Sequence, residues 1–219
     1  LFGAPSVSLV KGDHEREIHW RLHRSLLAVA RLALAADQRL SREELIETLW
    51  PGASADHVKR NFHPTLSGAR KALQGGRGGG IVYRQGTYSL DSAAEWQVDV
   101  HEFEARLAAG QEAEAQGRES QALDTLQQAW GRYRGPLLAG QDGHWIEPRR
   151  EWLHRRYLSL LELLGELASK VRRNTLALDA FRSLLLEEPF EERIHLAVME
   201  IYGRRGRRDL VRRQFVRLQ

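Results

Sequence analysis

The stretch SREELIETLWPGASADHVKRNFHPTLSGARKAL (residues 41–73) decides the fold, because it holds two helical patterns separated by Pro51-Gly52. In the first pattern Ser41 is followed three residues later by Glu44, which is the spacing of a capping box at the start of a helix. We therefore expect a helix over 42–49 that ends before the proline. Two helices joined by a short turn are typical of a helix-turn-helix.

The second pattern predicts a longer helix over 56–73, with Ser54 or Asp56 at its start. Its apolar residues recur at i, i+4, i+8, i+11 and i+15, so they fall on one stripe of the helix and should face the core. This stripe consists of Val58, Phe62, Leu66, Ala69 and Leu73. Gly75-Gly76 follows directly and is expected to stop the helix.

The opposite face of this helix is the candidate interface. At 100° per residue, it holds His57, Arg60, Pro64, Ser67, Gly68 and Lys71, with Asn61 and Thr65 on one flank and Lys59, His63 and Arg70 on the other. Pro64 removes a helical hydrogen bond at a cost of about 3 kcal/mol in a regular helix, but on an exposed face water can bind the freed carbonyl of Arg60. The alternative is a helix that starts at Pro64, a favoured first position, after an irregular turn over His57–His63.

The charge distribution around this helix points to an anionic partner. Residues 57–90 hold six Lys or Arg and no acid, whereas residues 91–104 hold five acids and no Lys or Arg. The net charge of +4 adds only a mild preference for anions. A solvated surface usually mixes its charges, so the acid-free window predicts contact with a polyanion such as nucleic acid.

The elements expected around the two helices complete a small α+β domain. Weak alternation predicts strands over 7–10 and 16–20, and apolar spacing predicts a helix over 22–36. The runs IVYR and TYSL (81–90) flank Gln85-Gly86 and predict a β-hairpin. Strands, three helices and a hairpin in this order are typical of a winged helix-turn-helix.

We place this winged helix-turn-helix domain over 1–94, with the hairpin as its wing. The helix 56–73 is expected to enter the major groove, and the wing tip, with Arg84 and Gln85, to contact the minor groove or phosphate. Contacts to phosphate are expected from Lys59, Arg70 and Lys71. Pro64 is expected to contact a thymine methyl group.

The remainder of the chain, 95–219, is helical in period and contains a repeat. Three segments share one frame: GRESQALDTL (117–126), RRNTLALDAF (172–181) and GRRDLVRRQF (206–215). The second and third lie 34 residues apart, which is the tetratricopeptide period. The first lies 55 residues before the second, so an insertion of about 21 residues is expected there. The fold class predicted is therefore mostly α: a small α+β winged helix-turn-helix domain followed by an all-α tetratricopeptide-like helical repeat domain.

These segments also carry a family likeness. REELIETLWPGASADHVKRNFHPTLSGARKAL with IVYRQGTYSL resembles the OmpR-type winged helix domain. VDVHEFEARL with YRGPLLAGQDGHWIEPRREWLHRRYLSLLELL resembles the bacterial transcriptional activator domain. Together they are similar to the Streptomyces antibiotic regulatory protein family. The resemblance implies binding of double-stranded DNA by the third helix and the wing, and contact of the repeat domain with a partner protomer, as a homodimer, or with RNA polymerase.

The resemblance also assigns residues. Arg60 and Thr65 match positions that contact phosphate, Pro64 matches a small apolar position against the bases, and Arg84 matches the arginine of the wing. The sequence departs from the family at Ser67 and Gly68, where relatives often carry Arg or another long polar side chain. We then expect specificity for the DNA sequence to depend on His57, His63 and the shape of the DNA.

Other classes of function find little support in the sequence. The chain has no Cys, which excludes disulfides and thiolate metal sites and favours a reducing cytoplasm. No apolar run approaches the 18 residues of a membrane span. His19 and His23 lack a third metal ligand of suitable spacing, and Asp142, His144 and Glu147 lack a nucleophile motif. We expect no enzyme activity, catalytic residue, metal or cofactor, and a loop held by a buried Trp145.

Two hypotheses of function therefore stand. The first is a DNA-binding transcription regulator, expected to be an activator. The second is a repeat-protein adaptor whose winged helix no longer contacts DNA, with Pro64 and Gly68 as marks of that loss. The chain begins at Leu1 and stops at Gln219, so we expect a piece of a longer protein that is truncated at its C-terminus. A following capping helix would then be missing and Phe215 would be under-covered.

Overall fold

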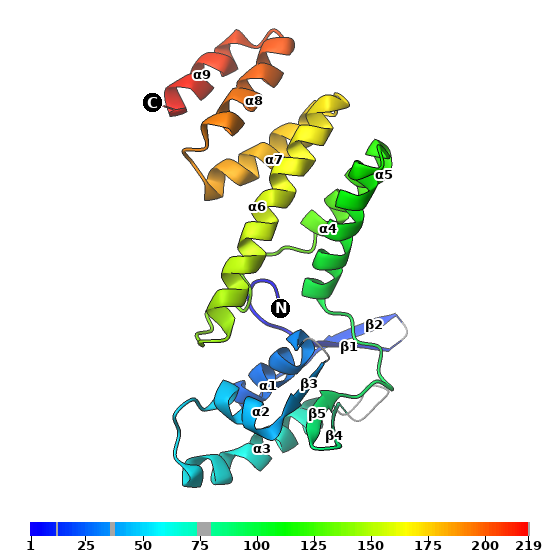
Figure 1. Cartoon of the computed structure of the whole chain (residues 1–219), viewed down its shortest axis with the longest axis vertical. Helices are drawn as coiled ribbons and strands as arrows, with labels where there is room; N and C mark the ends of the chain where they lie inside the picture. Colours follow the sequence, from blue (N-terminus) through cyan, green and yellow to red (C-terminus); the bar gives the residue numbers. More distant parts are fainter. Residues whose placement is uncertain (12, 36–37, 74–79, 219) are drawn as a thin grey trace. The chain divides into compact units, whose positions relative to one another are not determined.

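The computed structural model describes residues 1–11, 13–35, 38–73 and 80–218 (Figure 1). A small α+β part precedes a run of helices, as predicted. The elements of the α+β part are β1 (Ser8–Lys11), β2 (His14–Glu17), α1 (His23–Leu34), β3 (Arg39–Ser41), α2 (Arg42–Leu49), α3 (Ala55–Leu73), β4 (Ile81–Arg84) and β5 (Thr87–Leu90). The helical part consists of α4 (Asp99–Ala115), α5 (Glu119–Trp130), α6 (Ile146–Lys170), α7 (Asn174–Glu187), α8 (Glu192–Arg204) and α9 (Arg208–Leu218).

The chain forms two compact units that are not continuous in sequence. The first consists of Leu1–His101 and Arg134–Arg150, and we call it the winged-helix unit. The second consists of Glu102–Tyr133 and Glu151–Gln219, and we call it the repeat unit. A single cut near residue 94 therefore does not separate the two units. No described helix has the length and apolarity needed to cross a membrane.

The core of the winged-helix unit forms where α3 packs against α1 and the sheet. All five residues of the predicted apolar stripe are buried, and Phe62 is fully enclosed. The centroid of its ring lies 6.3 Å from that of Trp50, in a tilted arrangement, and 5.6 Å from that of Tyr88, edge-on. These contacts join α3 to the end of α2 and to β5, so they fix the orientation of the outer face of α3.

Local hydrogen bonds define where α2 and α3 begin. The Glu44 N–H donates to Ser41 Oγ at 3.1 Å and the Ser41 N–H donates to Glu44 Oε2 at 2.7 Å, which confirms the capping box. At the start of α3 the His57 N–H donates to Ser54 Oγ at 3.3 Å, so Ser54 rather than Asp56 caps this helix. The helix then runs without a break through Pro64. The alternative that the helix starts at Pro64 is therefore wrong.

The strands differ from the prediction in two places. The wing hairpin is confirmed, with Ile81 opposite Leu90 and Arg84 opposite Thr87. The N-terminal hairpin is also present, but its second strand is β2 rather than 16–20. The register pairs Lys11 with His14 and Ser8 with Glu17, so the second strand begins at His14 and ends before Ile18. The sequence prediction missed β3, which completes a sheet of order β3-β5-β4.

The predicted repeat is confirmed in the second unit as three helical hairpins: α4 with α5, α6 with α7, and α8 with α9 (Figure 1). Each repeated segment begins at a left-handed residue, with φ of 73° at Gly117, 62° at Arg172 and 70° at Gly206. The following N–H donates to the carbonyl five residues earlier in all three copies, at 2.8 to 2.9 Å. This is the hydrogen bond of a Schellman turn, so one turn type joins the helices of every hairpin.

A glycine lets the two helices of a hairpin approach closely in the first two repeats. A Cβ at Gly110 would lie 2.6 Å from Leu126 Cδ2, and one at Gly165 would lie 2.6 Å from Phe181 Cδ1. Leu126 and Phe181 are both buried. The corresponding residue in the third repeat, 34 positions after Gly165, is Met199.

The insertion between the first and second repeats belongs to the winged-helix unit. Phe2 forms a β-bridge with Leu137. The guanidinium of Arg150 donates to the carbonyls of Leu137 at 2.8 Å, Leu138 at 3.0 Å and Gln141 at 2.7 Å. These bonds hold residues 134–150 in one conformation.

The loop was expected to be held by a buried Trp145, and this is only partly correct. Ile146 is the fully buried residue, whereas Trp145 is half-buried. The Arg31 guanidinium carbon lies over the Trp145 ring, 5.5 Å from the ring centroid. Burial lowers the pKa of Arg31 below its usual value. The half-buried tryptophan is therefore held through a cation–π contact with Arg31 rather than through full burial.

Candidate nucleic-acid interface

The outer face of α3 carries a continuous exposed stripe. Six of the predicted residues are exposed, namely Lys59, Arg60, His63, Pro64, Ser67 and Lys71. Positions 60, 63, 64, 67 and 71 lie within about 60° of one direction around the helix axis at 100° per residue. The stripe therefore presents cations at both ends and the small residues Pro64 and Ser67 between them. We call these six residues the α3 stripe.

Pro64 stands in this stripe without breaking the helix. It cannot donate to the Arg60 carbonyl, and its ring is directed to solvent because both residues are exposed. Water can therefore bind the freed carbonyl, which a buried proline would have left without a partner. The result is a flat apolar patch on a helix surface with cations on both sides.

Two predicted residues lie on a different face. Thr65 is only 4% exposed, and its carbonyl accepts a hydrogen bond from Ser25 Oγ at 2.8 Å. A Cβ at Gly68 would lie 3.0 Å from the same Ser25 Oγ. Thr65 and Gly68 therefore face α1, and the expectation that Gly68 belongs to the outer face and Thr65 to its flank is wrong. The apolar stripe had located only the core side of α3, whereas α1 packs against its flank.

Three further predicted residues are half-buried: His57, Asn61 and Arg70. The Asn61 amide donates to the His57 carbonyl one turn earlier at 2.8 Å, so this amide group is used within the helix. Arg70 Nε donates to the Ile81 carbonyl at 2.8 Å. Arg70 thus ties α3 to β4 and fixes the wing beside the helix (Figure 1).

The wing tip is exposed and tightly turned. Gln85 has φ of 51° and Gly86 has φ of 82°, and two left-handed residues in a two-residue loop form a type I′ turn. Arg84 and Gln85 are exposed. Because Arg84 is the last residue of β4, its side chain lies at the free end of the hairpin.

Sequence reasoning missed an aromatic residue beside this tip. Tyr83 is 55% exposed, and its ring contacts Tyr88 at 4.6 Å. Burial raises the pKa of Tyr88 above its usual value, so this phenol stays neutral beneath Tyr83. The alternation in IVYR would have placed Tyr83 with Ile81 on the core face, but the sheet ends too soon to cover it.

The residues considered for other chemistry do not converge. No group of three potential metal ligands occurs among the described residues. The imidazole of His23 is hydrogen-bonded to the Gln141 side chain. Glu147 forms an ion pair with Arg150, and Asp142 and His144 are exposed. The segment that holds Asp142, His144 and Glu147 is therefore explained as a loop held in place by Arg150, not as a catalytic site.

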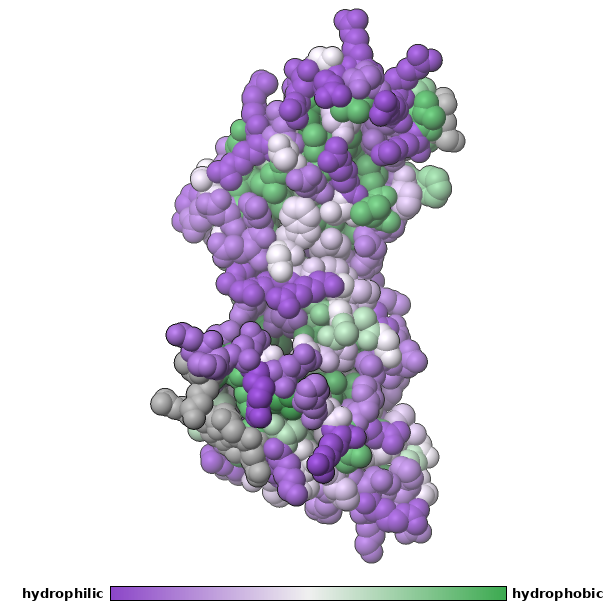
Figure 2. Space-filling view, turned by 180° about the vertical axis from the view of Figure 1, so that it is seen from behind, coloured by the Kyte–Doolittle hydropathy of each residue, from purple (hydrophilic) through white to green (hydrophobic). Residues whose placement is uncertain are grey.

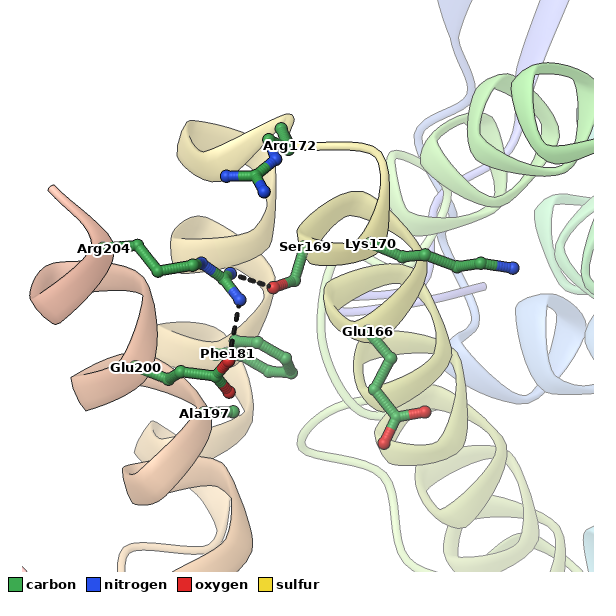
Figure 3. A pocket seen from close by; sticks show the side chains of 8 residues that line it. All are labelled: Glu166, Ser169, Lys170, Arg172, Phe181, Ala197, Glu200 and Arg204. Carbon is green, nitrogen blue, oxygen red and sulfur yellow. Dashed lines mark hydrogen bonds and ion pairs between the residues drawn. The ribbon is translucent and has the colours of Figure 1, made fainter.

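An open hollow of about 310 Å³ lies between α6, α7 and α8 in the repeat unit (Figure 3). Arg204 of α8 donates to Ser169 Oγ of α6 at 2.7 Å across it, and to Glu200 of its own helix at 2.9 Å. The lining consists of Glu166, Ser169, Lys170, Arg172, Phe181, Ala197, Glu200 and Arg204. Its cations are balanced by two carboxylates and by the ion pair of Lys170 with Glu119. The hollow therefore has no strong preference for an anion.

Comparison with known proteins extends these observations. Residues 98–219 match the family described as the bacterial transcriptional activator domain. Among curated proteins, the regulatory protein AfsR of Streptomyces coelicolor is 27% identical over 184 residues, which cover 84% of this chain and 18% of AfsR.

Among solved structures, Mycobacterium tuberculosis EmbR in complex with a low-affinity phosphopeptide has a similar fold, with a TM-score of 0.75 and 21% identity. The match covers 92% of this chain and 54% of EmbR. The chain thus spans about half of that solved protein and less than a fifth of AfsR. The similarity to EmbR extends over both the winged helix and the helical repeats.

Proposed function

Because the chain belongs to the bacterial transcriptional activator domain family, we propose that it binds double-stranded DNA through the α3 stripe and the wing and thereby regulates transcription. One observation carries this proposal. The exposed cations of α3 and the wing lie in a 34-residue window without a single acid, and the helix and hairpin are held together by Arg70. A surface of this kind attracts a polyanion.

The α3 stripe has the shape needed to approach a groove floor. Pro64 and Ser67 are small and stand at its centre, so the helix axis can come close to the bases. Lys59, Arg60 and Lys71 then lie where they can neutralise phosphates on either side. In this arrangement the cations supply affinity, and Pro64, Ser67 and His63 face the base edges.

The wing extends the same surface. Arg84 at the free end of the hairpin can enter a minor groove, where the negative potential is enhanced, and Tyr83 can pack against the sugar-phosphate backbone. In this proposal the repeat unit contacts other proteins, either RNA polymerase or a second protomer. Activation of transcription, rather than repression, follows from the family alone.

The alternative of a protein adaptor loses one of its two supports. Gly68 was one of the marks of a lost DNA contact, but its missing side chain makes room for Ser25 of α1 and for Leu22, the residue that precedes α1. Pro64 remains, and it is compatible with contact to bases. No observation in the winged-helix unit specifically favours an adaptor.

The test is a salt titration of binding to a duplex of random sequence, measured by fluorescence anisotropy. Lys59, Arg60, Lys71 and Arg84 together neutralise four charges of the DNA, which predicts a log–log slope of about −3.6. Arg60→Ala and Arg84→Ala should each reduce the slope by about 0.9 and weaken binding about tenfold. Selection from a pool of random duplexes then identifies the preferred site.

Arg16→Ala is the matched control, because Arg16 is an exposed arginine of β2 in the same unit. It removes the same charge outside the acid-free window, and it should leave the slope within its error. A slope near zero for the unaltered chain, or equal losses for Arg16→Ala and Arg60→Ala, would contradict DNA binding by this surface.

A further inference from the structure

A second hollow, of about 240 Å³, opens between α7, the end of α8 and the start of α9. Its lining includes residues in or next to the turns that join α6 to α7 and α8 to α9, and both turns lie at the same end of the repeat unit (Figure 1). Figure 2 shows long hydrophilic side chains projecting from this end. The polar residues that line the hollow are Thr175, Asp179, Arg182, Tyr202, Arg205 and Arg207. We call these six residues the arginine hollow.

Three arginines from three elements line the arginine hollow. Arg182 belongs to α7, Arg205 is the residue that ends α8, and Arg207 directly precedes α9. Arg182 Nη2 donates to the hydroxyl of Tyr202 at 2.8 Å, and Tyr202 is only 7% exposed. A buried phenol therefore positions one guanidinium at the wall of the hollow. The other two come from the α8–α9 turn, which is held by the Schellman hydrogen bond of the Arg207 N–H.

Nearby carboxylates neutralise this charge only in part. Arg182 lies 3.5 Å from Asp179, and Arg207 lies 3.2 Å from Asp209. All four side chains are more than half exposed, and an exposed ion pair stabilises by only about 0–1 kcal/mol. The side chain of Arg205 has no ion pair or hydrogen bond among the residues that the structure describes. Because each guanidinium has five donors, all three keep donors that a bound anion can use.

The junction between the first and second repeats, which we call the first junction, lacks this charge. By the repeat spacings of 55 and 34 residues, the residues that stand there in place of Arg182, Tyr202 and Arg205 are Gln127, Ala168 and Val171. The counterpart of Arg207 is Arg173, which forms an ion pair with Asp124 at 3.5 Å. Both junctions use the same type of turn, so the turn does not require the extra arginines. The added guanidiniums and phenol therefore belong to this one site rather than to the repeat.

We infer that the arginine hollow binds a small compound that carries a diphosphate group. Arginine forks bind phosphate oxygens in pairs, and three guanidiniums exceed what one carboxylate with a single charge can pair with. The hydroxyls of Thr175 and Tyr202 can donate to the same oxygens. Ligand pockets usually measure about 300–1,000 Å³, so a hollow of about 240 Å³ suits a ligand of this small size.

The exposure of the site sets the strength of binding. The hollow is open to solvent, so salt screens its charges and the affinity should fall as the ionic strength rises. Each guanidinium that makes charge-assisted hydrogen bonds to the ligand should contribute about tenfold to the affinity. Arg205 should contribute most, because it gives up no ion pair when the ligand binds. This inference does not rest on DNA binding, since all six residues belong to the repeat unit.

The test titrates inorganic pyrophosphate into the whole chain and measures binding by isothermal titration calorimetry at low and high ionic strength. The unaltered chain should show saturable binding that weakens with salt. Arg205→Gln and Arg182→Gln should each weaken this binding about tenfold. Arg173→Gln is the matched control, because Arg173 is the exposed arginine of the first junction, and it should leave the affinity unchanged.

Two further titrations identify the source of the diphosphate. Tighter binding of ADP than of pyrophosphate would support an organic diphosphate as the ligand, and weaker binding of ADP would support free pyrophosphate. Inorganic phosphate should bind more weakly than pyrophosphate, because it leaves part of the three guanidiniums without a partner. An affinity for inorganic phosphate equal to that for pyrophosphate would overturn the assignment of a diphosphate.

Thermal unfolding of every variant verifies that the repeat unit is folded. Arg205→Gln removes no described side-chain contact, so it keeps the test valid even if Arg182→Gln, which loses the bond to Tyr202, unfolds. An unaltered chain without saturable binding would overturn the inference. So would an affinity that Arg205→Gln leaves unchanged, which would place the anion elsewhere. Equal losses in Arg205→Gln and Arg173→Gln would also overturn it, because they would indicate general attraction to surface cations.

Discussion

Gly165→Ala tests whether the repeat hairpins depend on contact between glycine and the facing side chain. The added methyl group would lie 2.6 Å from Phe181 Cδ1 and 2.8 Å from Phe181 Cζ. Phe181 is 1% exposed, so its rigid ring has no free space to enter. Overpacking of this kind costs about 1–3 kcal/mol, and the upper end applies because a ring cannot bend away. Alanine also gains up to about 1 kcal/mol of helix propensity over glycine, so we expect a net loss of about 2 kcal/mol.

The matched control is Gly203→Ala in α8. A Cβ at Gly203 would have no atom within 4 Å, so only the helix propensity remains, and the variant should be stabilised by up to about 1 kcal/mol. Urea denaturation followed by circular dichroism measures both variants. Hydrogen exchange of the α6 and α7 amides assigns the change to the repeat unit rather than to the winged-helix unit.

A second background isolates the clash from other effects of the substitution. In Phe181→Ala, which itself costs about 3–5 kcal/mol, the ring is gone and Gly165→Ala should become neutral or stabilising. A change of sign between the two backgrounds is the signature of direct contact. If Gly165→Ala proved as stable as Gly203→Ala in the unaltered background, the close approach of α6 and α7 would be refuted.

Three further predictions concern the winged-helix unit. Arg150→Lys should lower its stability by about 2 kcal/mol, because one ammonium cannot reproduce the forked bonds to three carbonyls; an unchanged urea midpoint would contradict this. Glu44→Gln should cost up to about 0.5 kcal/mol at neutral pH. Hydrogen bonds from Ser41 hold the pKa of Glu44 below its usual value, so this carboxylate stabilises the fold above its unfolded pKa. The difference between the two proteins should therefore vanish as the pH falls through the lowered pKa in an acid titration of stability. Gly68→Arg should destabilise the unit in thermal unfolding, whereas Ser67→Arg should leave stability unchanged and strengthen DNA binding; equal melting temperatures for the two would show that Gly68 does not face α1.

The sequence predicted those features that depend on neighbouring residues. The capping box of α2, the apolar stripe of α3 and the turn of the wing are each set within a few positions, and all three are confirmed. The repeat was also accessible, because the segments that begin at Gly117, Arg172 and Gly206 share one sequence frame. In each case the physical cause acts locally, so the amino-acid pattern carries it.

The features that the sequence did not predict depend on contacts between distant segments. Gly68 was placed on the outer face and Thr65 on its flank because the helical period locates the core but not a neighbouring helix. The strand β3 was missed because three residues show no alternation, and only its pairing with β5 defines it. The dependence of Phe181 on Gly165 was missed because glycine in a helix carries no sign of what faces it.

The insertion shows why the family boundary and the folding unit do not coincide. The family match begins at residue 98, yet residues 134–150 within it pack with Leu1–His101. A fragment cut at the family boundary therefore loses the β-bridge of Phe2 with Leu137 and separates Trp145 from Arg31. The winged helix expressed as residues 1–101 would expose Phe2, which is 4% exposed in the whole chain. DNA binding by such a fragment then reflects a destabilised unit, so the α3 stripe has to be tested in the whole chain.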